Sequence, residues 1–298
     1  MERKVVVSLI QGGPRSADQS ANQAHNLTMI DLAAKARPDF IVFDELSTTP
    51  YFGVTRPKND YFDWAEPIPG EYTRKVGEKA RRHKCCIVVP MFENEGAVYH
   101  NSAAVLGPDG GLVSGRMPDG SRVRRYAKVH IPKVRTNDTP LDEKPYFASG
   151  PGFPVFETPL AKIGVAICFD RRFPEACRTL ALQGAEVVFL PGNFPWRNAQ
   201  SEDIYFAETK TRASENHLYV VACNKAGQET FDGVTTRFIG RSFVAGPDGD
   251  VVGPTGPSEE ATILTAELDL TRIQSSNERM PFLEERHPRK YVARSDNA

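Results

Sequence analysis

Residues 162–175 read KIGVAICFDRRFPE, and this stretch decides how the fold and the chemistry are interpreted. The apolar run before the cysteine is typical of a buried strand, which we expect to span Lys162–Cys168. The following helix is expected over Pro174–Gly184, because proline suits a first helical turn and apolar residues then recur at helical spacing. At such a strand-to-helix turn the sulfur of Cys168 can face a cleft, and a helix N-terminus can favour its thiolate. The position predicts a thiol-dependent enzyme.

Strands and helices alternate on both sides of this turn. Because apolar runs of strand length are followed by stretches with helical spacing, we expect an α/β fold with two sheets and helices on their outer faces. The other expected strands are Val5–Gln11, Phe40–Leu46, Cys85–Glu93, Glu186–Leu190 and Leu218–Asn224, and the other expected helices are Ala17–Ala36, Glu71–Lys84 and Asp203–Asn216.

Two further segments predict β-hairpins. Residues 102–110 (SAAVLGPDG) and 242–249 (SFVAGPDG) each run from an apolar strand into a Gly-Pro-Asp-Gly turn. The two copies suggest an internal repeat with βα units and one hairpin in each half, although turn chemistry alone also accounts for the match.

The composition is that of an ordinary globular chain, with 298 residues, 40% of them hydrophobic and 25% charged. The net charge of -1 gives no argument for a nucleic-acid or anionic-membrane partner. No apolar stretch approaches the roughly 20 residues that span a bilayer, and Val5–Ile10 is too short for a signal peptide. No low-complexity linker divides the chain, so we expect one domain over 1–283 and a polar arm or tail over 284–298.

The five cysteines are odd in number and fit a reducing compartment, so we expect a cytoplasmic protein. Apart from Cys168, they lie in apolar strand-like or helix-like runs and are expected in the core; they are Cys85, Cys86, Cys177 and Cys223. No histidine pair has zinc-ligand spacing and there is no CxxC motif, so we expect no metal site.

Two upstream segments offer the base and the cation that a thiol nucleophile needs. Asp44 and Glu45 stand near the end of an expected strand, where a carboxylate is either desolvated and usable as a base or an ordinary cap. Lys128 follows the strand-like run Val123–Ala127 and is either a cation of the site or a solvated surface lysine.

Taken together, four segments resemble the nitrilase superfamily of carbon–nitrogen hydrolases. In chain order they are 43–46 (FDEL), 126–132 (YAKVHIP), 142–147 (DEKPYF) followed by Gly150, and 164–175 (GVAICFDRRFPE). Glu45, Lys128 and Cys168 come in the order of that family, and Glu143 matches a second glutamate often found in such sites. The resemblance covers most of the chain.

This resemblance implies a four-layer α-β-β-α sandwich that pairs across a dimer interface, so we expect a homodimer or homotetramer. It also implies a cofactor-free Glu–Lys–Cys mechanism on a small amide or carbamoyl substrate. In that mechanism Cys168 attacks the carbonyl carbon, Glu45 moves the proton, and Lys128 supports the thiolate and the oxyanion. Glu143 orients Lys128 or the substrate nitrogen.

The residues after the cysteine bear on the substrate. Arg171 and Arg172 can pair with a substrate carboxylate, or they can instead fix the turn or bridge subunits. The run 170–175 (DRRFPE) and His130 resemble N-carbamoyl-D-amino acid amidohydrolases, in which the arginine pair binds the substrate carboxylate. The resemblance implies hydrolysis of N-carbamoyl amino acids to amino acid, ammonia and carbon dioxide.

Two positions depart from that group. Leu141 stands where it tends to have histidine, and Phe169 stands where it tends to have asparagine and is closer to general amidases. We expect Phe169 and Asn193 among the substrate-binding residues. Other readings are an amidase acting on a small carboxylated primary amide, a hydrolase of an N-carbamoylputrescine-like substrate, and a non-catalytic nitrilase-like ligand-binding module. The arginine pair argues against a cationic ligand, and the intact catalytic positions argue against the module.

Overall fold

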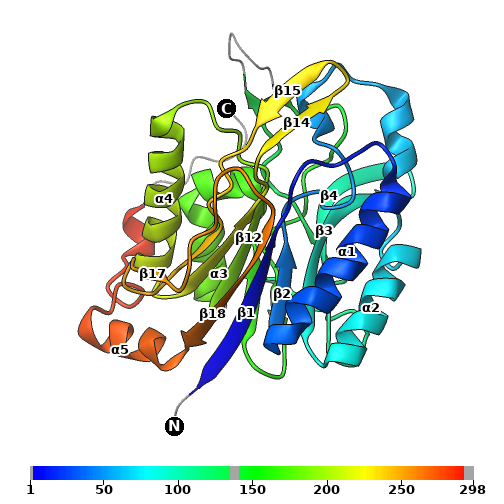
Figure 1. Cartoon of the computed structure of the whole chain (residues 1–298). Helices are drawn as coiled ribbons and strands as arrows, with labels where there is room; N and C mark the ends of the chain where they lie inside the picture. Colours follow the sequence, from blue (N-terminus) through cyan, green and yellow to red (C-terminus); the bar gives the residue numbers. More distant parts are fainter. Residues whose placement is uncertain (1–2, 135–140, 292–298) are drawn as a thin grey trace.

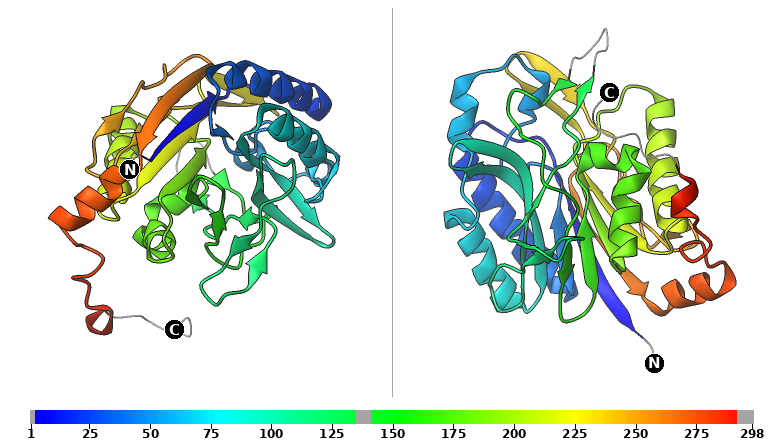
Figure 2. Two further views of the ribbon diagram at one scale, coloured as in Figure 1. Left: turned by 90° about the horizontal axis from the view of Figure 1, so that it is seen from below. Right: turned by 180° about the vertical axis from the view of Figure 1, so that it is seen from behind.

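The computed structural model describes residues 3–134 and 141–291 and confirms the α-β-β-α sandwich (Figure 1). Two sheets pack face to face, and helices cover the outer face of each (Figure 2). Apolar side chains of both sheets meet in one core, with Val42 and Val88 from the first sheet and Val165 and Val187 from the second all fully buried. Removing this apolar surface from water is the main stabilising contribution.

The first sheet holds the N-terminal strands. Strands β1, β2 and β3 are parallel, β18 and β4 pair antiparallel with β1 and β3, and β7 pairs antiparallel with β4. In spatial order the strands are β18 (Thr262–Asp269), β1 (Lys4–Gln11), β2 (Phe40–Phe43), β3 (Cys86–Glu95), β4 (Val98–Leu106) and β7 (Tyr126–Ala127). Helices α1 (Gln19–Ala33) and α2 (Glu71–His83) cover its outer face, where Ile30 and Val76 pack in a second core.

The second sheet is built mainly from the C-terminal half, with β5 and β6 added from the N-terminal half. Strands β11, β12 and β13 are parallel and central. In spatial order the strands are β17 (Val251–Val252), β16 (Phe243–Ala245), β13 (Tyr219–Asn224), β12 (Val187–Gly192), β11 (Lys162–Val165), β10 (Val155–Glu157), β5 (Gly115–Arg116) and β6 (Arg122–Val123). Helices α3 (Pro174–Leu182) and α4 (Ala199–Ser214) cover this sheet on the side away from the first (Figure 1).

Smaller elements complete the described residues. Two short hairpins pair β14 (Gln228–Phe231) with β15 (Val234–Arg237), and β8 (Lys133–Val134) with β9 (Leu141–Asp142). The remaining helices are α5 (Thr271–Arg279) and the 3-10 helices η1 (Ala34–Ala36), η2 (Phe52–Val54), η3 (Asn59–Trp64), η4 (Cys168–Arg172) and η5 (Pro288–Lys290). Within residues 3–134 and 141–291, no helix has the length and apolar character needed to cross a membrane.

Several expected boundaries are corrected by the structure. The strand before the cysteine ends at Val165, and Cys168 already belongs to a 3-10 turn. The expected strand Val123–Ala127 divides between the two sheets, because buried Arg125 turns toward Glu93, with Nε 2.6 Å from Oε2. Helix α4 begins four residues earlier than expected, because the side chain of Asn198 accepts the Ser201 N–H and caps it.

The two predicted hairpins have matching turns but different return strands. Gly110 and Gly249 both have positive φ, at 87° and 79°, and each donates its N–H to the glycine three residues earlier. The second turn leads into β17, whereas the first leads only to a single bridge between Leu106 and Leu112. Of the predicted C-terminal tail, residues 284–291 are mostly exposed and residues 292–298 lie outside the described residues.

The parallel strands point their carboxyl ends toward one edge of the sandwich. Asp44 and Glu45 follow β2, Cys168 comes shortly after β11, Asn193 follows β12, and Lys225 follows β13. In open α/β sheets, ligands bind in the crevice outside such strand ends. The fold therefore concentrates polar and reactive side chains at this edge.

Candidate active site

Cys168 stands on a sharp turn between β11 and α3. Its φ of 47° lies in the left-handed region, which residues other than glycine seldom occupy. Asp170 fixes the turn from inside, because its Oδ2 accepts the Ile167 N–H at 2.8 Å and the Tyr126 hydroxyl at 2.5 Å. The Cys168 side chain is consequently held at the edge of the sheet, with the residue only 7% exposed.

Three ionisable side chains from separate segments meet at this edge, close enough for their charges to act on the Cys168 thiol. Lys128 Nζ lies 2.8 Å from Glu45 Oε1 and 2.8 Å from Glu143 Oε2. All three residues are buried, and none is more than 1% exposed. The structure thus brings together Glu45, Lys128, Glu143 and Cys168, the four residues expected from the sequence to be catalytic, and excludes the readings of Glu45 as a cap and Lys128 as a surface lysine.

The Glu45 carboxylate is held by two asparagines as well as by the lysine. Asn101 Nδ2 donates to Oε1 at 2.8 Å, and the backbone N–H of Asn193 donates to Oε2 at 3.0 Å. The Asn193 side chain also donates to the Glu45 backbone carbonyl at 2.9 Å. Asn193, predicted as a substrate-binding residue, therefore contacts Glu45 directly, and its own Oδ1 has no partner.

Burial and charge set the ionisation of the group. Burial acts to lower the pKa of Lys128, but attraction to Glu143 and Glu45 outweighs it, and the pKa lies above its ordinary value. Burial raises the pKa of Glu143 to about 7 despite the opposing effect of Lys128. The lysine is therefore a stable cation, and Glu143 takes up and releases a proton near neutral pH.

The pKa of the Cys168 thiol is higher than we expected from the sequence. Burial, and then the neighbouring charge of Glu45, raise the pKa of Cys168 well above its ordinary value, although Lys128 acts in the other direction. The helix α3 begins only at Pro174, so its N-terminus is not directly at the sulfur. The expectation that a helix end favours the thiolate is therefore wrong, and the thiol needs a base to take its proton.

Cys168 opens into a cavity of about 170 Å³, the catalytic pocket. This volume is below the roughly 300–1,000 Å³ typical of clefts for drug-sized ligands, so the pocket suits a small substrate. Its wall includes Tyr51, Leu141, Phe169, Arg171, Arg172 and Arg197.

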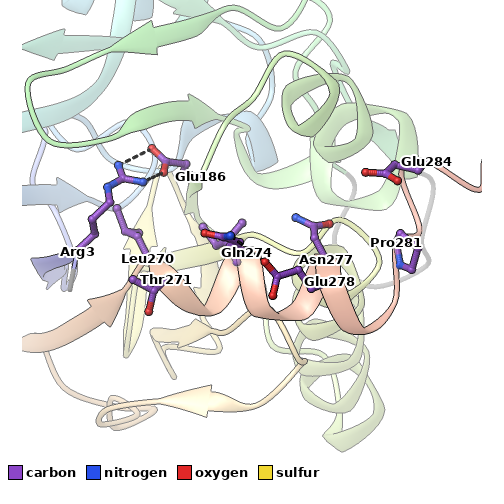
Figure 3. A pocket seen from close by; sticks show the side chains of 10 residues that line it. Arg3, Glu186, Leu270, Thr271, Gln274, Asn277, Glu278, Pro281 and Glu284 are labelled. Atoms are coloured by element: carbon purple, nitrogen blue, oxygen red, sulfur yellow. Dashed lines mark hydrogen bonds and ion pairs between the residues drawn. The ribbon is translucent and has the colours of Figure 1, made fainter. Parts of the chain in front are cut away.

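A larger hollow of about 840 Å³ lies beside α5 and shares no lining residue with the catalytic pocket (Figure 3). Arg3 and Glu186 on its wall pair with each other at 2.7 Å. None of the expected site residues lines it, so we place the candidate site at the catalytic pocket.

His130 and Phe173 support the turn that carries the cysteine. His130 Nδ1 lies 2.8 Å from Asp170 Oδ1, and its ring stacks on Phe173 at 3.6 Å between centroids. The His130 backbone N–H also donates to Asp170 at 3.0 Å. In this structure His130, predicted to bind substrate, holds Asp170 and through it the turn.

The two arginines that were predicted to bind a substrate carboxylate are instead paired with a carboxylate of the protein itself. Arg171 lies over the Phe194 ring at 4.0 Å, and its Nε is 2.9 Å from Glu208 Oε2, an ion pair without hydrogen-bond geometry. Arg172 donates to the other oxygen of Glu208 at 2.6 Å. The two arginines thus share one carboxylate of α4, while Phe169 lines the pocket and packs edge-on against Phe173.

The sequence reasoning missed four residues of the site: Tyr51, Asn101, Asp170 and Arg197. Asp170 stands inside the opening motif, and its position two residues after the cysteine was an available signal. Tyr51 is 1% exposed, its hydroxyl has no partner, and burial followed by the charges of Glu143 and Cys168 raises its pKa well above its ordinary value. No local pattern in the sequence marks Tyr51, Asn101 or Arg197.

Among the described residues, no three or more histidine, cysteine, aspartate or glutamate side chains are grouped so that they could hold a metal ion.

Comparison with known proteins defines the class. The family model for carbon–nitrogen hydrolases matches residues 6–278. The carbon–nitrogen hydrolase from Helicobacter pylori G27 superposes with a TM-score of 0.85 over 97% of each chain, at 26% identity. The chain therefore belongs to the carbon–nitrogen hydrolases of the nitrilase superfamily and is an enzyme acting on non-peptide C–N bonds.

Two similar sequences belong to enzymes that are named for their substrates. The chain is 35% identical over 285 residues to the N-carbamoylputrescine amidase of Solanum lycopersicum, covering 92% of this chain and 89% of the relative. It is 32% identical over 281 residues to the citrullinase of Francisella tularensis subsp. tularensis, covering 91% and 92% of the two chains. Both relatives are named for substrates that end in a carbamoyl group.

Proposed function

We propose that this enzyme hydrolyses the terminal carbamoyl group of small N-carbamoyl amino acids, releasing amino acid, ammonia and carbon dioxide. The observation that carries the proposal is the buried contact of Lys128 with both Glu45 and Glu143 beside the only cysteine that lines the catalytic pocket among the described residues. Because a buried thiol with a raised pKa is a poor nucleophile, Glu45 serves as its base.

In the first half of the reaction, Glu45 takes the proton of the Cys168 thiol as the sulfur forms a bond to the carbamoyl carbon. The charge that develops on the carbonyl oxygen is stabilised by Lys128 Nζ and by the backbone N–H of Phe169. The bond between that carbon and the terminal nitrogen then breaks, Glu45 returns the proton to this nitrogen, and ammonia leaves. The carbonyl carbon stays bonded to the sulfur and to the nitrogen of the amino acid, as a thiocarbamate.

In the second half, Glu45 removes a proton from water as the water oxygen attacks the same carbon. The C–S bond breaks and the thiolate recovers a proton, so the enzyme returns to its starting state. The carbamic acid that is released breaks its remaining C–N bond to give carbon dioxide and the amino acid, and no oxidant or reductant is consumed. Each positioned donor in such a site typically contributes about 3 kcal/mol to transition-state stabilisation.

Two unpaired polar atoms favour a substrate with a terminal NH₂ group. Glu143 Oε1 and the Tyr51 hydroxyl are buried and lack a partner, although Glu143 Oε2 already accepts from Lys128. An unpaired buried polar group is costly, and a bound substrate that supplies N–H donors removes that cost. A carbamoyl group offers two such donors on one nitrogen.

The charge of the pocket favours a substrate that carries a carboxylate. Arg171, Arg172 and Arg197 line it, and no aspartate or glutamate does so among the described residues. One carboxylate, that of Glu208, balances the first two arginines, which leaves a net positive mouth. Citrulline, for which one relative is named, combines a carbamoyl end with a carboxylate.

A second candidate is an uncarboxylated, cationic substrate such as N-carbamoylputrescine. The 35% identity to an enzyme named for that substrate favours it. The arginines of the pocket oppose it, because a substrate ammonium and a guanidinium repel each other.

An ammonia-release screen of the purified chain tests the proposal. N-carbamoyl amino acids of D, L and β type, N-carbamoylputrescine and primary amides are compared with wild type, Cys168→Ala and Cys177→Ala. Turnover of the N-carbamoyl amino acids is expected in wild type and in Cys177→Ala, whose buried thiol lies on α3 outside the pocket. Turnover in Cys168→Ala is expected to fall by about 10⁵-fold or more with the fold retained. Full activity in Cys168→Ala contradicts the mechanism, and turnover of N-carbamoylputrescine alone contradicts the substrate.

A further inference from the structure

The loop between β12 and α4 carries a cation whose backbone is fixed. The N–H of Phe194 donates to Asn224 Oδ1 at 2.9 Å, that of Trp196 donates to the Arg237 carbonyl at 2.7 Å, and that of Arg197 donates to Ser201 Oγ at 3.1 Å. The Arg197 residue itself is exposed. Its guanidinium therefore extends from a rigid position.

Arg197 stands at the boundary of two cavities. It lines the catalytic pocket together with Cys168, and it also lines a neighbouring cavity of about 290 Å³ beside β14 and β15, the hairpin pocket. Leu141 and Pro195 are the other residues shared by the two cavities. A ligand whose reacting carbon lies at Cys168 thus has Arg197 on the wall of the same cavity.

The arginines around the two cavities differ in whether their charge is already balanced. Arg171 and Arg172 share Glu208, and Arg237 of the hairpin pocket pairs with Glu259 while its guanidinium lies 4.3 Å from the Trp196 ring centre. For Arg197, no carboxylate lies within ion-pair distance among the described residues. Among the residues that the structure describes, Arg197 therefore has its charge available to an anion that enters from solvent.

The paired arginines are less suitable for the same task. Arg171 is 6% exposed, and burial, which outweighs the charges of Cys168 and Glu208, lowers its pKa. If Arg171 or Arg172 turned toward a ligand, Glu208 would lose one of its two ion pairs. The Glu208 side chain is only 20% exposed, so water would replace that partner poorly. Breaking a partly buried ion pair costs free energy that an already unpaired cation does not lose.

We propose that Arg197 binds the carboxylate of the substrate and selects anionic N-carbamoyl compounds, in place of the Arg171–Arg172 pair. The inference rests on the proposed function, because it assigns the carboxylate of that substrate to one residue. A guanidinium binds a carboxylate through two parallel hydrogen bonds, which fixes the position of the carbamoyl end as well as its charge.

The kinetic test compares Arg197→Gln with wild type on N-carbamoyl-β-alanine and on uncharged N-propylurea. A charge-assisted hydrogen bond lost from substrate binding raises KM for the anionic substrate by about 10- to 100-fold. The KM for N-propylurea is expected to stay unchanged, because that substrate has no carboxylate. Arg237→Gln removes a guanidinium near the same loop that is already paired, and it is the matched control with unchanged kinetics on both substrates.

Two further experiments separate direct binding of the substrate carboxylate by Arg197 from long-range electrostatic attraction. Arg197→Glu is expected to reverse the preference, so that N-carbamoylputrescine is turned over faster than N-carbamoyl-β-alanine. In about 0.5 M salt, long-range attraction is screened, so a KM difference that persists there reports direct contact. A difference that disappears in salt overturns the proposal, and so does a large KM rise in Arg172→Gln with none in Arg197→Gln.

The outcomes also separate this inference from the proposed function. If wild type hydrolyses N-carbamoyl amino acids but Arg197→Gln leaves KM unchanged, only the assignment of Arg197 is wrong. If wild type hydrolyses no anionic N-carbamoyl compound, the proposed function fails, whatever the variants do.

Discussion

Asp44 and Glu45 are adjacent in the chain, yet their carboxylates belong to two different buried charge clusters. Asp44 accepts two hydrogen bonds from the Arg15 guanidinium, at 2.7 and 3.0 Å, and Lys225 Nζ lies 3.0 Å from Glu229 nearby. We call these four residues the closed cluster. Glu45 instead joins Lys128 and Glu143 in what we call the open cluster.

The two clusters differ in charge balance and in hydrogen bonding. The closed cluster has two cations and two carboxylates, and Glu229 also accepts the backbone N–H groups of Arg15 and Tyr51 at 2.7 and 2.6 Å. None of its fully buried side-chain polar atoms lacks a partner. The open cluster has one cation for two carboxylates, and Glu143 Oε1 is unpaired.

The difference shows which buried charges stabilise the fold and which remain able to bind a ligand or take part in catalysis. A fully satisfied cluster stabilises only one arrangement of its chain segments, whereas an incomplete one has capacity for a ligand. Tyr51 touches both: its backbone N–H is bound to Glu229 in the closed cluster, while its hydroxyl at the catalytic pocket has no partner. The closed cluster therefore positions a residue of the pocket.

The strongest test of this division replaces each of the two adjacent carboxylates by its amide, in two separate variants. Glu45→Gln is expected to lower kcat by about 10³- to 10⁴-fold, because it removes the base, with little change in melting temperature. Asp44→Asn is expected to lower the unfolding free energy by about 3–5 kcal/mol, because Arg15 loses its buried partner, and to retain most of kcat where it is folded. Kinetics and urea unfolding on both variants measure this, and a folded but inactive Asp44→Asn contradicts the division.

A second, smaller effect is expected at the other end of the closed cluster. Lys225→Met leaves Glu229 with two backbone donors but without a cation, so the unfolding free energy is expected to fall by about 3 kcal/mol. The kcat below the melting transition is expected to stay near that of wild type. Denaturant unfolding followed by ammonia release on the same samples checks both, and a selective loss of kcat would place Lys225 in the chemistry.

The smallest expected effect is the pH dependence of stability in Glu143→Gln. Because the pKa of Glu143 is raised from 4.5 to about 7 in the folded chain, that chain binds more protons than the unfolded one between these values. The unfolding free energy of wild type therefore falls as pH rises from about 4.5 to 7, by at most about 3 kcal/mol from this residue, and is flat above that. Glu143→Gln is expected to lack this slope in urea unfolding at several pH values.

Glu229→Gln is the matched control for that slope. Burial raises the pKa of Glu229, but Lys225 and the backbone donors outweigh burial and lower the pKa below its ordinary value. Its contribution to stability is consequently complete above pH 4.5 and is lost only in more acidic solution. Between pH 5 and 8 the variant is expected to differ from wild type by a constant amount, and an equal slope in the two variants would contradict the assignment for Glu143.

The sequence was most informative where a functional residue lies in a short contiguous motif. Glu45, Lys128, Glu143 and Cys168 each stand in a short run with recognisable neighbours, and the alternating strands and helices predicted the layers correctly. The contacts that involve distant residues were not predictable in this way. Arg15 and Glu229 are 214 positions apart, and no local pattern indicates that Glu208 of α4 binds both arginines after the cysteine.

The remaining errors have separate physical causes. An apolar run shows where a strand can form but not where its ladder ends, so the end of β11 at Val165 was missed. The pKa of Cys168 depends on burial and on charges from three other segments, which no single stretch of sequence contains. Arg197 has no periodic or motif signal, and only the shapes of the two cavities show its position.

The left-handed backbone of Cys168 has a consequence for how this enzyme evolves. A non-glycine residue in that conformation costs about 1–2 kcal/mol, and serine or alanine at the same position would bear the same penalty. Glycine, which has no Cβ, escapes it, so replacement of the nucleophile by glycine would relax the turn. Selection for stability and selection for turnover therefore oppose each other at one codon, and a glycine at this position in a related chain would indicate that catalysis is no longer under selection.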